Sequence, residues 1–130
     1  MNRPPYKKII KIDYDNTIDG AGYPHVGRLL PLALETIREL KYSNTIIIDT
    51  CRHGVALQEC IKYMDAMGIV YHYVNENTLD KINFFGDTRK ISADISIDDK
   101  NLNAPLIANK YIDWVKVREI LKLEPLDISK

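Results

Sequence analysis

Three short apolar segments of the sequence each end in acidic or hydroxyl side chains, and this pattern is what most constrains the fold. The segments are KIIKID (8–13), NTIIIDT (44–50) and ADISIDD (93–99). Stretches with helical spacing separate them, which predicts βαβ units and a mostly parallel sheet. In such a sheet, ligands bind beyond the carboxyl ends of the strands. We therefore expect the polar ends of these segments to meet at one edge.

The apolar periodicity predicts an alternation of strands and helices along the whole chain. We expect strands at 7–13, 44–49, 69–74 and 93–97, and helices at 31–41, 55–67 and 112–123. Gly68 should end the second helix. The glycine-rich segment 18–29 and the segments 75–90 and 101–109 are expected to be loops. The predicted fold class is α/β, with a three-layer Rossmann-like arrangement, a mostly parallel central sheet and no large cap domain.

Length and composition set the class of protein. The chain has 130 residues, which predicts a single domain over 1–130. Lys plus Arg equals Asp plus Glu at 18 each, and this balance argues against nucleic acid as the main partner. The apolar runs are too short to cross a membrane, and the first residues lack the apolar run of a signal peptide. Two cysteines are too few for a disulfide framework, so we expect a cytoplasmic protein.

Four carboxylates should converge at the carboxyl edge of the sheet, namely those of Asp13, Asp15, Asp98 and Asp99. Like charges at close range repel unless a cation lies between them. Mg²⁺ prefers oxygen ligands, takes one or two carboxylates, and leaves room for a substrate phosphate. The cluster therefore predicts Mg²⁺ as the cofactor and a phosphorylated molecule as the substrate.

Such a cluster can carry out phosphoryl transfer. A carboxylate held against Mg²⁺ stays ionised and can attack phosphorus. A second carboxylate two residues further on can protonate the leaving oxygen and later activate water. A hydroxyl group and a lysine can hold the phosphoryl oxygens while charge moves between them.

The order of these residues resembles a known family. The segment Asp13-Tyr14-Asp15-Asn16-Thr17 after an apolar strand resembles the DxDxT motif of the haloacid dehalogenase (HAD) superfamily. Thr50 at the end of the second strand, Lys90, and the pair Asp98-Asp99 are similar to its three later motifs, in the same order. The chain looks most like the small capless HAD phosphatases of bacteria and phages, including capsule-related hydrolases.

The resemblance implies a catalytic role and a metal site for the acidic residues. Asp13 would be the nucleophile that forms an aspartyl-phosphate. Asp15 would be the general acid and base, and its backbone carbonyl would contact Mg²⁺. Asp98 and Asp99 would complete the metal site with Asp13. The implied function is a Mg²⁺-dependent phosphatase whose substrate stays open among sugar phosphates, nucleotides and larger phosphorylated molecules.

The resemblance also implies residues that bind the phosphoryl group. Thr50 and Lys90 would hold its oxygens, although Lys81 and Lys100 are alternatives to Lys90. Arg52, two positions after Thr50, is a further candidate for phosphate binding. A homo-oligomer in which a neighbouring subunit supplies a lid is left open.

Two positions depart from the family pattern, and Thr17 has an expected structural role. Asn16 stands where glycine is common, and we expect it to keep the turn because Asn tolerates left-handed backbone angles. Asp49 stands before Thr50 where an apolar residue is more usual, and we expect it to point to the other side of its strand. Thr17 should brace the loop that carries Asp13.

Two other functions fit a parallel sheet with an acidic cluster. One is a receiver-like regulatory module that accepts a phosphoryl group without turnover. The order of the acids argues against it, because a receiver has its adjacent acids after the first strand. The other is a non-catalytic domain that binds phosphate or a protein, and the intact pair Asp13 and Asp15 argues against it.

Cysteine and histidine offer weaker alternatives. Cys51 followed by Arg52 suggests a tyrosine-phosphatase site, but that chemistry needs an arginine six positions after the cysteine, where this chain has Leu57. His25 and His53 have no partners at zinc-ligand spacing, so we expect them at the surface or at the edge of the substrate site.

Overall fold

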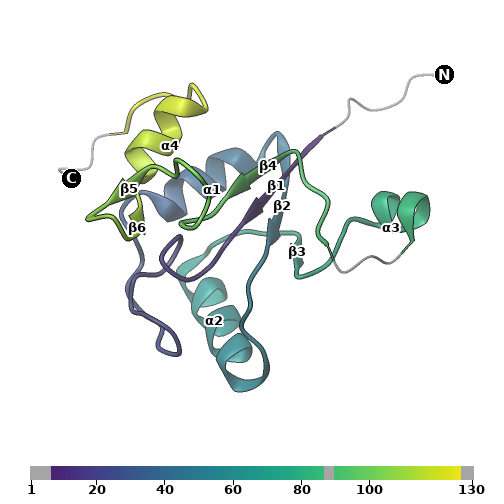
Figure 1. The fold of residues 1–130 in the computed structure, drawn as a ribbon, viewed down its shortest axis with the longest axis horizontal. Helices are drawn as coiled ribbons and strands as arrows, with labels where there is room; N and C mark the ends of the chain where they lie inside the picture. Colours follow the sequence, from purple (N-terminus) through teal and green to yellow (C-terminus); the bar gives the residue numbers. More distant parts are fainter. Residues whose placement is uncertain (1–6, 87–89, 127–130) are drawn as a thin grey trace.

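A four-stranded parallel sheet forms the centre of the computed structural model, which describes residues 7–86 and 90–126 (Figure 1). Its strands lie in the order β3-β2-β1-β4, and they are β1 (Lys8–Ile12), β2 (Asn44–Ile48), β3 (Tyr73–Val74) and β4 (Ile95–Ile97). A separate antiparallel pair consists of β5 (Leu106–Ile107) and β6 (Tyr111–Ile112). The helices are α1 (Ala33–Lys41), α2 (Gly54–Met67), α3 (Leu79–Phe85) and α4 (Trp114–Ile120). The predicted α/β class with a mostly parallel central sheet is confirmed.

The two faces of the sheet carry different side chains. Alternate side chains of β1 and β2 enter the main core, and these are Ile10, Ile12, Ile46 and Ile48. The opposite face carries Lys11 and Asp49, whose side chains form a salt bridge of 3.4 Å. The expectation that Asp49 points to the other side of its strand is therefore confirmed. Both groups are partly exposed, so this ion pair contributes little to stability.

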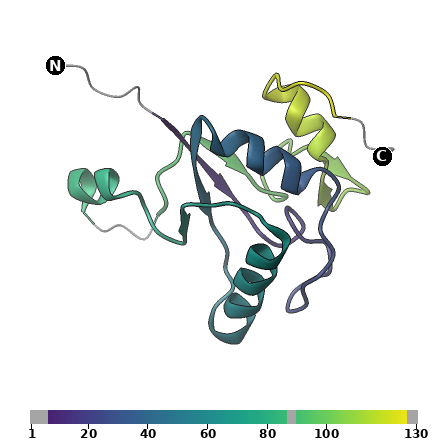
Figure 2. The same ribbon diagram turned by 180° about the vertical axis from the view of Figure 1, so that it is seen from behind.

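Three helices cover the core face. Connections between neighbouring parallel strands are right-handed, so α1 and α2 fall on the same side of the sheet as the chain steps from β1 to β2 to β3. Figure 2 shows α1, α2 and α4 on the near side of the sheet, and α3 set apart from them at its edge. Their buried side chains, such as Ile37, Met64 and Trp114, belong to the same apolar cluster as the strands. This packing holds the carboxyl ends of β1, β2 and β4 at one edge.

The strongest sequence signals correspond to the observed elements. The strands β1 and β2 and the helix α2 lie where the apolar periodicity predicts them. Gly68 ends α2 in a left-handed conformation with φ of 79°, as predicted. The segment 18–29 contains neither a helix nor an extended strand. None of the helices in the described part of the chain is long and apolar enough to cross a bilayer.

Three expectations about local structure were wrong. The helix α3 lies inside the expected loop 75–90, and the strand β5 lies inside the expected loop 101–109. The strand β6 takes the first residue of the expected helix 112–123. These elements are too short to show a periodic pattern. The strand β3 is shorter than expected because the His72 side chain, through Nδ1, accepts the Ile46 N–H at 2.9 Å in place of a backbone carbonyl.

The loop after β1 is anchored by the C-terminal part of the chain. The indole Nε1 of Trp114, at the start of α4, donates to the carbonyl oxygen of Thr17 at 2.7 Å. The Ile112 N–H donates to the carbonyl oxygen of Asn16 at 2.9 Å. Trp114 and Thr17 are both buried. These contacts fix the backbone that follows the first strand, where Asp13 and Asp15 lie.

We expect the Trp114 anchor to contribute measurably to stability. Trp114→Phe removes the indole N–H and leaves the buried Thr17 carbonyl without its donor, which should lower the free energy of unfolding by about 2 kcal/mol. The measurement is denaturant unfolding followed by circular dichroism. Val115→Ala, at a partly exposed neighbour, is the control and should change the free energy by less than about 0.5 kcal/mol. A Trp114→Phe protein as stable as this control would contradict the anchor.

Candidate functional site

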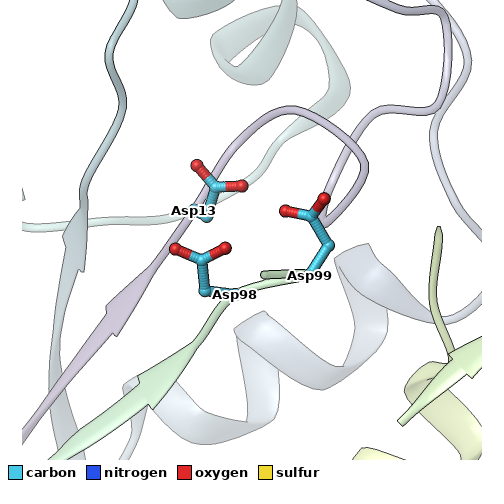
Figure 3. Close-up of side chains that lie close together, drawn as sticks. All are labelled: Asp13, Asp98 and Asp99. Carbon is cyan, nitrogen blue, oxygen red and sulfur yellow. The ribbon is translucent and has the colours of Figure 1, made fainter. Parts of the chain in front are cut away.

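Parallel pairing brings three of the four expected carboxylates together. Ile12 at the end of β1 pairs with Ile97 at the end of β4, and the Asp13 N–H donates to the Ile97 carbonyl oxygen at 3.0 Å. The next residues, Asp98 and Asp99, therefore lie beside Asp13. Carboxylate oxygens of these three aspartates lie within 4.8 Å of one another. Figure 3 shows the three side chains facing a common space beyond the ends of the strands.

The electrostatics of this acidic cluster favour a bound cation. Burial, a hydrogen bond with Asp99 and the charges of Asp98 and Asp99 raise the pKa of Asp13 to about 8. In addition, Asp99 Oδ1 and Asn16 Oδ1 are buried and accept no hydrogen bond within the described part of the chain. Oxygen atoms without donors and mutually repelling carboxylates are what a hard divalent cation stabilises. The residues present therefore fit Mg²⁺.

Thr17 links the two halves of the acidic cluster. Its hydroxyl donates to Asp13 Oδ2 at 3.3 Å and accepts the Asp99 N–H at 3.2 Å. The neighbouring Asn16 adopts a left-handed conformation with φ of 60°. Asn16 thus keeps the turn as the sequence predicts, and Thr17 braces the loop as the resemblance implies.

Asp15 is not one of the three clustered aspartates and pairs with Arg52. The guanidinium donates to both carboxylate oxygens, from Nε to Oδ2 at 2.9 Å and from Nη2 to Oδ1 at 2.7 Å. The Arg52 side chain is 1% exposed and the Asp15 side chain 26%. This contact raises the pKa of Arg52 above its ordinary value. Asp15 therefore lies at the cavity as a paired carboxylate, separate from the three acids that face one another.

Arg52, an expected phosphate ligand, already donates to protein oxygens with all of its N–H groups. Besides Asp15, the acceptors are the carbonyl oxygens of Pro24, His25 and Ala56, at 3.1, 2.6 and 3.2 Å. To contact a phosphoryl group, Arg52 would have to give up one of these hydrogen bonds.

Thr50 lies at the end of β2, where the sequence places it, and its position is set by two neighbours. The Thr50 backbone N–H donates to Asn75 Oδ1 at 2.8 Å, and Thr50 Oγ1 accepts the backbone N–H of Arg52 at 3.1 Å. The second bond uses a lone pair of Oγ1, so the hydroxyl hydrogen remains a donor for a ligand. Asn75 reaches Thr50 from a left-handed conformation with φ of 56° just after β3.

A cavity of about 420 Å³ joins these groups. Its lining residues come from the ends of β1, β2 and β4 and from the loop before α1, and they are Asp13, Asp15, Asn16, Tyr23, Thr50, Cys51, Arg52, His53, Asp98, Asp99 and Lys100. Lys90, the expected phosphate ligand, is not among them. Its side chain is exposed, and its carbonyl oxygen accepts a hydrogen bond from Asn77 Nδ2 at 2.9 Å. Lys100, one of the two alternatives, does line the cavity.

Sequence reasoning missed Asp19, which organises the loop beside the cavity. Its carboxylate accepts the Tyr14 hydroxyl at 2.6 Å and the backbone N–H groups of Ala21, Gly27 and Arg28 at 2.8 to 3.0 Å. Burial alone would raise the pKa of Asp19, but these hydrogen bonds lower it below its ordinary value. An aspartate in a glycine-rich segment often accepts the backbone N–H two residues further on and so forms a turn. This signal could have identified Asp19.

Comparisons with known proteins support the fold. A solved structure of a conserved protein from Bacteroides thetaiotaomicron is similar to this chain, with 30% sequence identity and a TM-score of 0.72. The similarity covers 90% of this chain and 91% of that chain, so the fold is shared over nearly the whole of both. No protein-family model matches the chain, and no curated protein does.

We expect Mg²⁺ to stabilise the protein more at pH 8 than at pH 5. The pKa of Asp13 is about 8 in the folded protein and close to 3.8 in the unfolded chain. Between these values the folded state holds a proton that the unfolded state has lost, so stability without metal should fall as pH rises toward 8. At pH 5 nearly every molecule carries this proton, and Mg²⁺ must displace it. At pH 8 many molecules have already lost the proton, so Mg²⁺ binding costs less. The measurement is the melting temperature with Mg²⁺ and with EDTA at both values.

Asp49→Asn is the matched control for this experiment, because Asp49 is an acid outside the cluster and pairs with Lys11. It should keep the Mg²⁺ effect, whereas Asp98→Asn should reduce it. An equal rise in melting temperature at both pH values would contradict cation binding at Asp13.

Proposed function

We propose that this protein is a Mg²⁺-dependent phosphatase that hydrolyses phosphomonoesters through an aspartyl-phosphate on Asp13. The observation that carries the proposal is the convergence of Asp13, Asp98 and Asp99, with carboxylate oxygens within 4.8 Å, in a cavity that Asp15 and Thr50 also line. Such a set offers a cation site, a nucleophile, an acid or base, and a hydroxyl donor within one cavity.

In the first step, a carboxylate oxygen of Asp13 attacks the phosphorus of the substrate. The ester P–O bond breaks, and the leaving oxygen takes the electron pair of that bond. Asp15, in its protonated form, gives this oxygen a proton, so the leaving group departs as an alcohol. A protonated carboxyl still has acceptor capacity on both oxygens, so Asp15 keeps its two hydrogen bonds with Arg52 while its O–H faces the leaving oxygen.

In the second step, water attacks the phosphorus of the aspartyl-phosphate. Asp15, now a carboxylate, accepts the proton of the water. The bond between phosphorus and Asp13 breaks, its electron pair returns to the Asp13 carboxylate, and inorganic phosphate leaves. Both aspartates are then in their starting forms, so one cycle consumes one ester and one water.

Charge on the phosphoryl group has several partners in the cavity. Asp13, Asp98 and Asp99 would hold Mg²⁺, which supplies positive charge to the phosphoryl oxygens when bound. Thr50 offers its hydroxyl hydrogen. Lys100 lines the cavity and replaces Lys90 as the lysine that we propose for the phosphoryl group.

The form of the cavity favours substrates with an accessible phosphate. No separate cap domain covers it in residues 7–86 and 90–126. Tyr23, Cys51, His53 and Lys100 form its outer lining, and Tyr23 is 61% exposed. We therefore propose phosphate groups on larger molecules, or on sugars and nucleotides that bind from the open side.

The test is steady-state hydrolysis of an aryl phosphate by the wild type and by Asp13→Asn. The wild type should turn over many equivalents with Mg²⁺ and none with EDTA. Asp13→Asn removes the nucleophile and should lower kcat by at least about a thousandfold. Asp49→Asn is the matched control and should keep full activity.

Two results would contradict the phosphatase. Equal activity of Asp13→Asn and wild type would point to a contaminating enzyme. Mg²⁺-dependent phosphorylation of Asp13 by a small phosphodonor, with no release of phosphate, would favour the receiver-like module instead. Peptide mass spectrometry after acid quenching detects that phosphoryl group.

A further inference from the structure

We propose that Arg52 is a positioning residue, which holds the Asp15 carboxylate and the loop beside the cavity in one fixed frame and does not bind the phosphoryl group. That loop, residues 20–28, is called the rim loop below. The role in catalysis rests on the proposed function, because it gives Asp15 a part in the reaction. The mechanical role, holding the rim loop, does not.

Every side-chain N–H group of Arg52 already donates to a protein oxygen. A guanidinium has five N–H groups. Two go to Asp15, two to the rim-loop carbonyls of Pro24 and His25, and one to the carbonyl of Ala56 in the first turn of α2. One side chain thus joins the loop after β1, the rim loop and α2. A phosphoryl oxygen would have to compete with an acceptor already in place.

The surroundings of the guanidinium also limit its movement. Its central carbon lies 5.0 Å from the ring centroid of Tyr14 and 5.3 Å from that of Tyr23, so two aromatic rings contact it. The Tyr14 hydroxyl is itself held by Asp19. A planar cation held by two rings and five acceptors has little freedom to turn toward a ligand.

The rim loop is anchored through its backbone N–H groups and also through its backbone carbonyl groups. Asp19 accepts N–H groups of Ala21, Gly27 and Arg28, and Arg52 donates to carbonyl groups between them in sequence. The Asp19 carboxylate thereby holds N–H groups of the rim loop, and the Arg52 guanidinium holds its carbonyl groups. The rim loop should behave as a fixed edge of the cavity, with the Tyr23 ring held against the Arg52 guanidinium.

Substituting Arg52 with Gln and with Lys separates positioning from phosphate binding. Gln keeps part of the volume but loses the charge. Lys keeps the charge, but a single ammonium cannot donate to Asp15 and to three carbonyls in the geometry of the guanidinium fork. If Arg52 positions Asp15, both variants should be defective. If Arg52 instead contacts phosphate through its charge, Arg52→Lys should keep the function that Arg52→Gln loses. Arg38→Gln is the matched control, because Arg38 is exposed and donates to Gly68.

The first measurement is amide hydrogen exchange of the rim loop by mass spectrometry, without substrate. Exchange should be at least about tenfold faster in Arg52→Gln and Arg52→Lys than in wild type, and unchanged in Arg38→Gln. Unchanged exchange in the Arg52 variants would overturn the proposal. If Arg52→Gln fails to fold, Arg52→Lys carries the same comparison.

The second measurement compares kcat with the inhibition constant of inorganic phosphate. Positioning predicts that kcat falls by at least about tenfold in both variants while the inhibition constant changes by less than about twofold. A phosphate ligand would instead raise the inhibition constant, and Lys would restore it; this result would overturn the proposal. If the wild type hydrolyses no phosphate ester, the proposed function fails, and the exchange experiment alone decides whether Arg52 holds the rim loop.

Discussion

The parallel pairing of β1 with β4 is the constraint on which the site depends. It sets Ile12 beside Ile97, so the residues that follow each strand meet although they are distant in the sequence. The apolar side chains of these strands are buried against α1, α2 and α4, and this burial holds the register against the repulsion of the carboxylates. The free energy of the core thus maintains an arrangement of charges that would not form by itself.

The loop after β1 places its acids in two opposite electrostatic situations. Asp15 and Asp19 are matched by hydrogen-bond donors at both carboxylate oxygens. Asp13 faces two further acids, and Asp99 keeps a buried oxygen without a donor. The matched acids stabilise the folded chain, whereas the unmatched ones reduce its stability. A protein keeps such a mismatch where something outside the chain completes it.

The sequence contains enough information to place the acidic cluster but not to describe its surroundings. Asp13, Thr50 and Asp98 could be placed because each follows a short apolar run, and the alternation of these runs with helical segments identifies them as strands. The contacts of Arg52 could not, because three of its five side-chain hydrogen bonds go to backbone carbonyls, which leave no trace in side-chain identity. The resemblance implies Lys90 from its place before Asp98, whereas Lys100 is the lysine that lines the cavity. The helix α3 and the β5–β6 pair lie in segments too short for a periodic signal.

The hydrogen bond between Trp114 and Thr17 links positions 97 residues apart and thereby affects the order of assembly. During synthesis the loop with the acids leaves the ribosome long before its anchor does. The first strands and helices can pair and bury apolar surface early, because their contacts are nearer in sequence. The cavity reaches its final form only after residue 114 emerges. A nascent chain therefore carries the acids of the site well before it has the complete site.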